Sequence, residues 1–342
     1  MKRIVVSGAV IYSLFLMLVP AAGASDGVLE INQACADNTG CFTGDSAGFP
    51  VEIVGSVGRS YRLTSDLVLP SASVSGITIS VPSVSIDLNG FEIVTAECVG
   101  ATSNCTPGSG NGDGIGFQGP NAGDNRGISV KNGSVTGMGD DGLKLGKQAE
   151  VINVRTRWNG SYGIYAEDGS TVTGSAAYEN AVDGIHVLDN SIVTDNTVYL
   201  NGSDGIDAWG RCRVSGNTVG SNGNNGISVG SGSTVTGNTA MDNAVDGIWA
   251  DQGSTVSGNA AYSNTGDGIQ AEEGAAVSGN TVRNNSQLGL RLEATASYLG
   301  NNVSNNTAGT VSGGVDAGGN VCDGTTTCPE HRKFKRRFRR VR

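Results

Sequence analysis

Apolar and polar positions repeat with a constant period of 21 residues between Met138 and Asn306. A Gly followed by a branched aliphatic residue marks every repeat, at Gly142-Leu143, Gly163-Ile164, Gly184-Ile185, Gly205-Ile206, Gly226-Ile227, Gly247-Ile248, Gly268-Ile269 and Gly289-Leu290. A Val column keeps the same step, at Val151, Val172, Val193, Val214, Val235, Val256 and Val277, and ends at Tyr298. A fixed period in this range is typical of a solenoid, in which each repeat buries its apolar face against its neighbours.

The pattern within one repeat predicts strands. In residues 243–263, Ile248, Ala250 and Val256 alternate with polar residues, and Gly, Asn, Asp and Ser separate the segments. Period two with turn residues between short runs indicates strands and corners. The repeats lack the Leu content of leucine-rich repeats and the Gly-Gly-x-Gly-x-Asp nonapeptide of calcium-binding β-rolls. We therefore predict an all-β chain, a right-handed parallel β-helix with 21-residue coils of about three short strands.

Coil stacking gives each column a place in this fold. Equivalent residues of successive coils are expected about 4.8 Å apart. The Ile/Leu column is then an internal aliphatic stack. An Asn column with the same step is expected to form amide ladders at the corners. Its members are Asn159, Asn180, Asn201, Asn222, Asn243, Asn264, Asn285 and Asn306.

The N-terminus has the pattern of a secretory signal at residues 1–24. Lys2 and Arg3 precede the apolar run Ile11–Val19, and Ala22–Ala24 is a small-residue cleavage site. The apolar run is too short for a membrane span. We predict an exported protein that is secreted, periplasmic or attached to the cell surface.

The region before the regular repeats has its own organisation. Val28–Ala36 is predicted to be a short helix that caps the first coil and protects its strand edges. Strand-like runs follow at Val51–Val54, Arg59–Leu69, Ile77–Val81 and Val84–Val94. Residues 98–125 form a Gly/Asn/Ser/Pro-rich insertion that either walls a groove or is a tolerated surface insertion. The predicted parts are a signal peptide (1–24), a cap with irregular first coils (25–125), regular coils (126–321), and a disulfide loop with a basic tail (322–342).

Two segments carry a family resemblance. Ser60–Leu67 (SYRLTSDL) and Ile86–Phe91 (IDLNGF) resemble the N-terminal coils of bacterial secreted right-handed parallel β-helix repeat proteins of the pectate-lyase-like superfamily. Together with the periodic coils, the resemblance covers residues 28–328. It implies the fold strongly and the activity weakly, because that superfamily includes polysaccharide lyases, hydrolases, uronan epimerases and members without known activity.

The cysteines are also typical of export. Six of the seven fall into local pairs, Cys35/Cys41, Cys98/Cys105 and Cys322/Cys328, which we expect to form disulfides in the cap, the insertion and the C-terminal end. Cys212 stands in a column of small residues. We interpret it as a free, inert thiol.

Charge divides the chain sharply. Residues 25–330 carry a net charge of −20, whereas residues 331–342 (HRKFKRRFRRVR) add eight positive charges and no acid. An acidic body argues against nucleic-acid binding. The tail is expected either to contact an anionic surface, such as lipopolysaccharide, an acidic glycan or the body of a neighbour, or to be a solvated end.

The residue after each repeat Ile or Leu is expected to point outward, because side chains alternate along a strand. This outward column collects most of the chemically capable residue types, in the order Lys144, Tyr165, His186, Asp207, Ser228, Trp249, Gln270 and Arg291. The positions two residues further on include Glu167, Leu188, Trp209, Asp251, Glu272 and Glu293. Exposed Trp is uncommon on a soluble surface, and its flat face suits sugar stacking. The predicted substrate-binding residues are Trp209, Trp249, Glu167, Asp251 and Arg291.

Four consecutive members of the column, Lys144, Tyr165, His186 and Asp207, are the candidate catalytic set. On a uronic acid, a cation would neutralise the carboxylate and acidify the α-proton, a Tyr or His would take or return that proton, and a carboxylate would orient the His. Asp183, three residues before the His, adds some likeness to uronan epimerases, which place a Tyr, an Asp-x-His pair and another Asp on this fold. The Asp-Pro-His motif itself is absent, and so are the Asn-Thr-Asp, His-Gly and Arg-x-Lys motifs of polygalacturonase-like hydrolases.

An acidic column stands just before the repeat glycine, at Asp141, Asp183, Asp204, Asn225, Asp246 and Asp267. It is either turn chemistry, in which each side chain caps its own backbone, or a set of Ca²⁺ ligands shared between coils. The sequence assures no cofactor, and Ca²⁺ is the one that it suggests. Paired carboxylates for glycoside hydrolysis could be drawn from Asp207, Asp251 or Glu167, but the acids are too plentiful for this to single any out.

The predicted function is binding of an extracellular or cell-surface carbohydrate through the outward Lys/Tyr/His/Asp/Trp face. The alternative is a polysaccharide lyase or uronan C5-epimerase acting on an acidic glycan. A remote alternative is an ice-binding or purely structural solenoid, since Thr-x-Thr arrays flank the Val column. Ile192, Arg213 and Ala276 interrupt those arrays.

Overall fold

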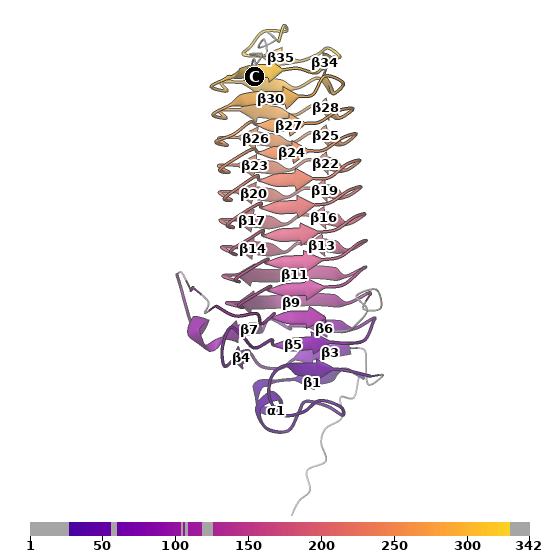
Figure 1. Cartoon of the computed structure of the whole chain (residues 1–342), viewed down its shortest axis with the longest axis vertical. Coiled ribbons are helices and arrows are strands. Elements are labelled where there is room, and N and C mark those ends of the chain that lie inside the picture. Colours follow the sequence, from indigo (N-terminus) through magenta and orange to yellow (C-terminus); the bar gives the residue numbers. More distant parts are fainter. Residues whose placement is uncertain (1–26, 56–59, 104, 107–108, 118–125, 329–342) are drawn as a thin grey trace, which may run out of the picture.

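The computed structural model describes residues 27–55, 60–103, 105–106, 109–117 and 126–328. The predicted signal sequence and the basic tail lie outside these residues. The described chain winds into a single elongated column of stacked coils, a parallel β-helix (Figure 1). The predicted fold class is therefore confirmed.

One side of the column is a 12-stranded parallel sheet, which we call the site sheet. Its strands are β2 (Val51–Ile53), β5 (Ile77–Ile79), β8 (Ile115–Phe117), β10 (Leu143–Leu145), β12 (Ile164–Ala166), β15 (Ile185–Val187), β18 (Ile206–Ala208), β21 (Ile227–Val229), β24 (Ile248–Ala250), β27 (Ile269–Ala271), β30 (Leu288–Leu292) and β33 (Gly309–Ser312).

The other strands form two further columns, which β9 (Ser129–Thr136) and β11 (Glu150–Arg157) join because each runs through both. The first column contains β1 (Leu29–Ile31), β3 (Ser60–Leu63), β6 (Ser85–Asp87), β13 (Thr171–Thr173), β16 (Ile192–Thr194), β19 (Arg213–Ser215), β22 (Thr234–Thr236), β25 (Thr255–Ser257), β28 (Ala276–Ser278), β31 (Ser297–Leu299) and β34 (Val315–Asp316). The second contains β4 (Leu67–Leu69), β7 (Glu92–Thr95), β14 (Ala176–Tyr178), β17 (Thr197–Tyr199), β20 (Thr218–Gly220), β23 (Thr239–Met241), β26 (Ala260–Tyr262), β29 (Thr281–Arg283), β32 (Asn302–Ser304) and β35 (Val321–Cys322).

The N-terminal cap is shorter than predicted and starts later. Leu29–Ile31 pairs with β3 as a strand, and the helix α1 is Gln33–Asn38. Asn32 ends the strand and caps the helix, because its side chain accepts a hydrogen bond from the backbone N–H of Cys35 at 3.0 Å. The helix lies across the first coil (Figure 1). A short 3₁₀ turn, η1 (Ala96–Cys98), begins the insertion.

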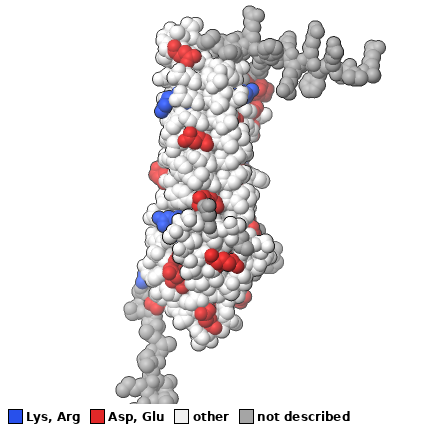
Figure 2. Space-filling model, turned by 90° about the vertical axis from the view of Figure 1, so that its left-hand side faces the viewer, with Lys and Arg blue, Asp and Glu red and all other residues white. Residues whose placement is uncertain are grey.

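The three predicted disulfides are present, at Cys35–Cys41, Cys98–Cys105 and Cys322–Cys328. Cys212 is free and buried, as expected. No helix in the described ranges is long and apolar enough to span a bilayer. Along one side of the column, charged side chains are scattered singly over an otherwise uncharged surface (Figure 2).

The repeating apolar columns are the core. The Ile/Leu and Val columns are fully buried from coil to coil, and Tyr298 closes the Val column at 4% exposure. The Asn159 column forms the predicted ladder: the side-chain NH₂ and the backbone N–H of Asn180 both donate to Asn201 Oδ1, at 2.9 and 3.1 Å.

A second amide ladder, which we did not predict, follows the second corner. Its members are Asn196, Asn217, Asn238, Asn259, Asn280, Asn301 and Asn320. Most of them keep the same 21-residue step, so the sequence already contained the signal. Each amide satisfies buried polar groups of its neighbours, which is what an interior corner needs.

The ladder predicts a large effect for a single amide. Asn238→Ala removes the oxygen that accepts from both the backbone N–H and the side-chain NH₂ of Asn217, at 2.9 Å each. Two buried donors lose their partner, so the free energy of unfolding should fall by about 2–4 kcal/mol. Guanidinium denaturation followed by circular dichroism measures this. Asn302→Ala, at an exposed position of β32, is the matched control. Equal denaturation curves for the two variants would contradict the role given to the ladder.

Candidate functional site

The outward column forms one straight line across the site sheet. Lys144 pairs in register with Tyr165, Tyr165 with His186, and His186 with Asp207. The line continues through Ser228, Trp249, Gln270 and Arg291. The buried Ile/Leu column on the same strands fixes the inward side, which leaves this column to point outward. The four candidate catalytic residues thus stand on β10, β12, β15 and β18.

His186 lies between two carboxylates. Its Nδ1 atom is 3.3 Å from Asp183 Oδ2 and 3.1 Å from Asp207 Oδ2. Asp183 precedes the repeat glycine on the same coil, and Asp207 stands on the next strand of the site sheet. The His side chain is 7% exposed and Asp183 is 5% exposed. Asp183 therefore acts on the imidazole in a largely dry setting, whereas the Asp207 side chain is 24% exposed.

This environment fixes the protonation of the imidazole. Burial by itself lowers the pKa of His186, but the hydrogen bonds and charges of Asp183 and Asp207 outweigh it and raise the pKa to about 9. At neutral pH the side chain is an imidazolium, which is a proton donor.

Aromatic rings surround the imidazole on several sides. Tyr165 stacks on it with ring centroids 5.5 Å apart and an interplanar angle of 9°. Tyr162 approaches to 4.8 Å, and Trp209 meets the ring edge-on at 6.1 Å. Burial, together with neighbouring carboxylates, raises the pKa of both tyrosines, so their hydroxyls are protonated at neutral pH. Tyr162 was not among the predicted residues, although it replaces the Asp of the column before the repeat glycine.

Lys144 belongs to a separate cluster. Its Nζ lies 3.3 Å from Asp140 and 3.5 Å from Asp141. Burial opposes its charge, but Asp113, Asp141 and Asp140 raise the pKa of the ammonium. Asp113 lies within the 98–125 insertion, and burial raises the pKa of its carboxyl to about 6. The sequence did not single out this residue, because a position within the insertion has no fixed place in the period.

The side chains of the acidic column before the repeat glycine accept hydrogen bonds from the backbone of the next coil and not from their own backbone. Asp183 Oδ1 accepts the backbone N–H of Asp204 at 2.9 Å, and Asp204 Oδ1 accepts that of Asn225 at 2.8 Å. Asp246 and Asp267 make the same contact to the coil after them. The own-backbone interpretation is therefore corrected, because the strand spacing places the next coil's N–H within reach.

Two groups of side chains could hold a cation. Among the described residues these groups are Asp183, His186 and Asp207, and Asp113, Asp140 and Asp141, and in each the ligand atoms lie within 4.8 Å of one another. Oxygen-rich sets of this kind suit hard cations. The ammonium of Lys144 already lies against the second group. Calcium binding stays a prediction.

The two predicted substrate-binding tryptophans, Trp209 and Trp249, line one pocket. Trp209 is 52% exposed, whereas Trp249 is half-buried. They line a surface pocket of about 410 Å³ whose polar rim includes Asp189, Asp207 and Asp251. Arg211 and Ser231 reach into the rim, where they bind Asp189 at 2.8 Å and Asp251 at 2.5 Å. Asp207 is common to this pocket and to the His186 cluster, so the two adjoin.

The other two predicted binding residues stand apart from this pocket. Arg291 pairs with the buried carboxylate of Asp267 through two contacts. Glu167 follows Tyr165 on the N-terminal side of the His186 cluster, where burial raises the pKa of its carboxyl and Lys147 lowers it.

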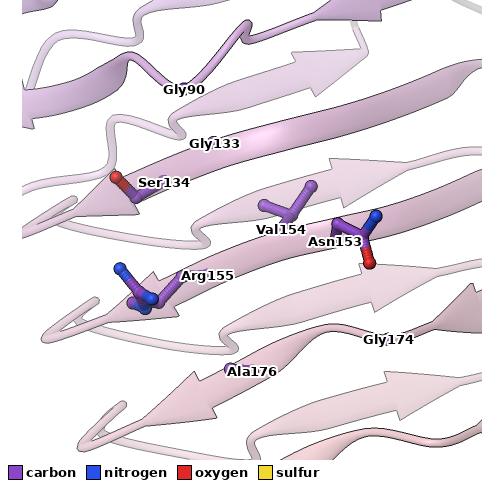
Figure 3. Close-up of a pocket in the computed structure, with 8 residues that line it drawn as sticks. All are labelled: Gly90, Gly133, Ser134, Asn153, Val154, Arg155, Gly174 and Ala176. Atoms are coloured by element: carbon purple, nitrogen blue, oxygen red, sulfur yellow. The ribbon is translucent and has the colours of Figure 1, made fainter.

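A second depression, of about 360 Å³, is lined by residues outside the site sheet (Figure 3). It follows β9 and β11 and is floored by Gly90, Gly133 and Gly174, with Arg155 at its margin. A Cβ atom on Gly133 would come within 2.3 Å of Leu88, so this glycine is required by packing. The depression shares no residue with the His186 cluster, and we interpret it as a consequence of that packing.

The chain is similar to a known protein family and to several solved structures. The chain matches the model of a right handed beta helix region over residues 71–219, 126–276 and 210–325. A mutant of the periplasmic alginate epimerase AlgG has a TM-score of 0.62 at 16% identity, covering 84% of this chain and 81% of that one. The A-module of the mannuronan C-5 epimerase AlgE6 from Azotobacter vinelandii has a TM-score of 0.53 at 18% identity, covering 85% and 89%.

The catalytic unit of a GH87 α-1,3-glucanase from Streptomyces thermodiastaticus has a TM-score of 0.50 at 16% identity, covering 89% of this chain and 65% of that one. None of the curated sequences compared with the chain matches it. Identities this low show a shared fold and leave the activity to the site. The family matches extend over most of the chain, which therefore belongs to the right-handed β-helix family.

Proposed function

We propose that the protein is an exported polysaccharide-binding protein and that the glycan lies along the site sheet, over His186, Trp209 and Trp249. The observation that carries the proposal is the exposed Trp209 ring on a carboxylate-rimmed pocket that adjoins the His186 cluster. An exposed indole face offers an apolar platform to a sugar ring, and carboxylates accept hydrogen bonds from sugar hydroxyls. The three disulfides support an oxidising compartment, which is secreted, periplasmic or on the cell surface.

In this proposal the polymer lies parallel to the column axis, along the register of the site sheet. Asp207 and Trp249 are two coils apart, which is about 10 Å along the column. A chain lying parallel to the column axis would meet Tyr165, the Trp209 pocket and Trp249 in turn. The named structural neighbours are two epimerases of alginate and mannuronan and one glucanase, and these names support a carbohydrate ligand.

A second candidate function is a polysaccharide lyase or uronan C5-epimerase acting on an acidic glycan. The stack of Tyr165 on His186, with Asp183 and Asp207 behind the imidazole, favours it. In β-elimination the C5 proton passes to a base and the C4–O bond breaks to leave a C4–C5 double bond. In epimerisation a proton returns to C5 from the opposite face. Because His186 is protonated at neutral pH, its role in either reaction would be that of the acid, and it becomes a base only above about pH 9.

The binding proposal predicts a strong dependence on one ring. Trp209→Ala should lower the affinity for the best-bound polymer of a polysaccharide array at least tenfold, because truncating a central Trp removes a dominant contact. Isothermal titration calorimetry on that polymer measures the loss. Leu299→Ala removes a side chain of similar exposure from the far end of the first column and should bind like the wild type. Unchanged binding by the Trp209 variant would contradict the assignment of this pocket as the polysaccharide-binding site.

The catalytic candidate makes a different prediction. His186→Gln and Tyr165→Phe should abolish turnover of a uronan while leaving its binding within about threefold, because the roles proposed for them are proton transfers and not anchoring. Ultraviolet absorbance of the unsaturated product detects elimination, and NMR of the same samples detects epimerisation, both with calcium present. If neither assay detects a product while binding is intact, catalysis is contradicted and binding remains as the function.

The state of His186 can be measured directly. The chain has two histidines, and His331→Gln leaves one imidazole signal in the NMR spectrum. We expect that signal to titrate near pH 9 in the folded protein, against an ordinary value of 6.5. Because the folded pKa is the higher one, the stabilisation is complete below about pH 6.5 and is lost as the pH rises through about 9. A midpoint at or below pH 6.5 would contradict the arrangement of the two carboxylates.

A further inference from the structure

We infer that the polysaccharide held on the site sheet is electrically neutral, and that polyuronates and other anionic glycans are disfavoured there. This inference rests on the proposed binding function and names the class of polymer. It is carried by the pairing of the cations on this face and by the excess of carboxylates around the pocket.

The cationic side chains along the outward column and its pocket are already paired with carboxylates of the protein, within the part of the chain that the structure describes. Lys144 lies against Asp140 and Asp141. Arg291 pairs with Asp267, and Arg211 donates to Asp189 at 2.8 Å and to Asn190 at 3.0 Å. An anionic sugar is best held by a free guanidinium that donates two parallel hydrogen bonds to its carboxylate. Here Arg291 makes such a pair of contacts to Asp267, and Arg211 donates one hydrogen bond to the Asp189 carboxylate and one to the Asn190 amide.

The imidazolium of His186 does not supply the missing positive charge. It is almost fully buried, it is flanked by Asp183 and Asp207, and the rings of Tyr162 and Tyr165 lie against it. Two carboxylates against one imidazolium leave this cluster with a negative balance. A uronate carboxylate placed above it would meet acids at close range, where like charges repel most strongly.

The pocket itself has the same sign. Its rim carries the carboxylates of Asp189, Asp207 and Asp251 against the single guanidinium of Arg211. These carboxylates are acceptors, and the complement of an acceptor is a hydroxyl donor. Hydroxyl-to-carboxylate hydrogen bonds are charge-assisted and therefore strong. A neutral sugar offers several hydroxyls at its edge and an apolar face for Trp209, which is the chemistry that this pocket displays.

The test compares polymers that differ in charge and share a backbone. Alginate and polygalacturonate would each be assayed beside their carboxyl-reduced forms, together with neutral α-1,3-glucan, mannan and xylan. Affinity electrophoresis of the full chain in EDTA measures binding without bridging metal ions. We expect at least one neutral polymer to bind ten times or more tighter than either charged parent, with little dependence on salt, because salt screens only the charged interactions.

Two other results separate the inference from the function on which it rests. Binding of a charged parent as tight as that of the neutral polymers, in EDTA, overturns the inference and leaves carbohydrate binding intact. Binding of none of these polymers, charged or neutral, by a correctly folded chain overturns the proposed function and the inference with it.

A charge-matched pair of variants tests the pocket directly. Asp251→Asn removes a rim carboxylate, and Asp242→Asn removes an exposed carboxylate after β23, so the two change the net charge equally. The first should weaken the neutral polymer about threefold and strengthen the charged parent, whereas the second should change neither. Equal effects of the two variants would show that only net charge matters, and this would overturn the assignment of the pocket as a neutral-sugar site.

Discussion

The structure depends on one constraint: the polar groups buried at the corners need hydrogen-bond partners on the neighbouring coils. The two amide ladders meet it by having each Asn accept hydrogen bonds from the backbone and side chain of the coil before it. An unpaired amide in this dry interior would cost more free energy than one hydrogen bond contributes. The 21-residue step is therefore fixed by hydrogen bonding at the corners as well as by the stacking of Ile and Val.

The same register builds the site without any dedicated element. Because each outward position faces the equivalent position of the next coil, the residues that stand there become neighbours automatically. This is how Tyr165, His186 and Asp207, 21 residues apart in sequence, come to share one line. A solenoid can thus vary its outer face while its core and corners stay the same.

The sequence predicted what the period controls. The coil fold, the buried columns, one amide ladder and the line of outward residues all follow from residue type at a fixed step, and the three disulfides follow from Cys pairs that are close in sequence. Asp113 and the ion pairs of Lys144 were not predictable in this way. The first depends on how the chain returns from an irregular segment, and the second on which of several nearby carboxylates a flexible side chain reaches. Tyr162 was visible only as a break in the acidic column.

That acidic column explains why the cations of the outer face are engaged. A stack of buried carboxylates at strand spacing repels itself, and it needs positive neighbours or protons. Lys144 forms an ion pair with Asp141, His186 with Asp183, and Arg291 with Asp267. Burial also raises the pKa of the carboxyls in this column, to about 7 for Asp204 and about 6 for Asp246. The basic residues that look catalytic in sequence are therefore first of all counter-ions of the acidic column. The side chains left to meet a ligand are the carboxylates and the aromatic rings.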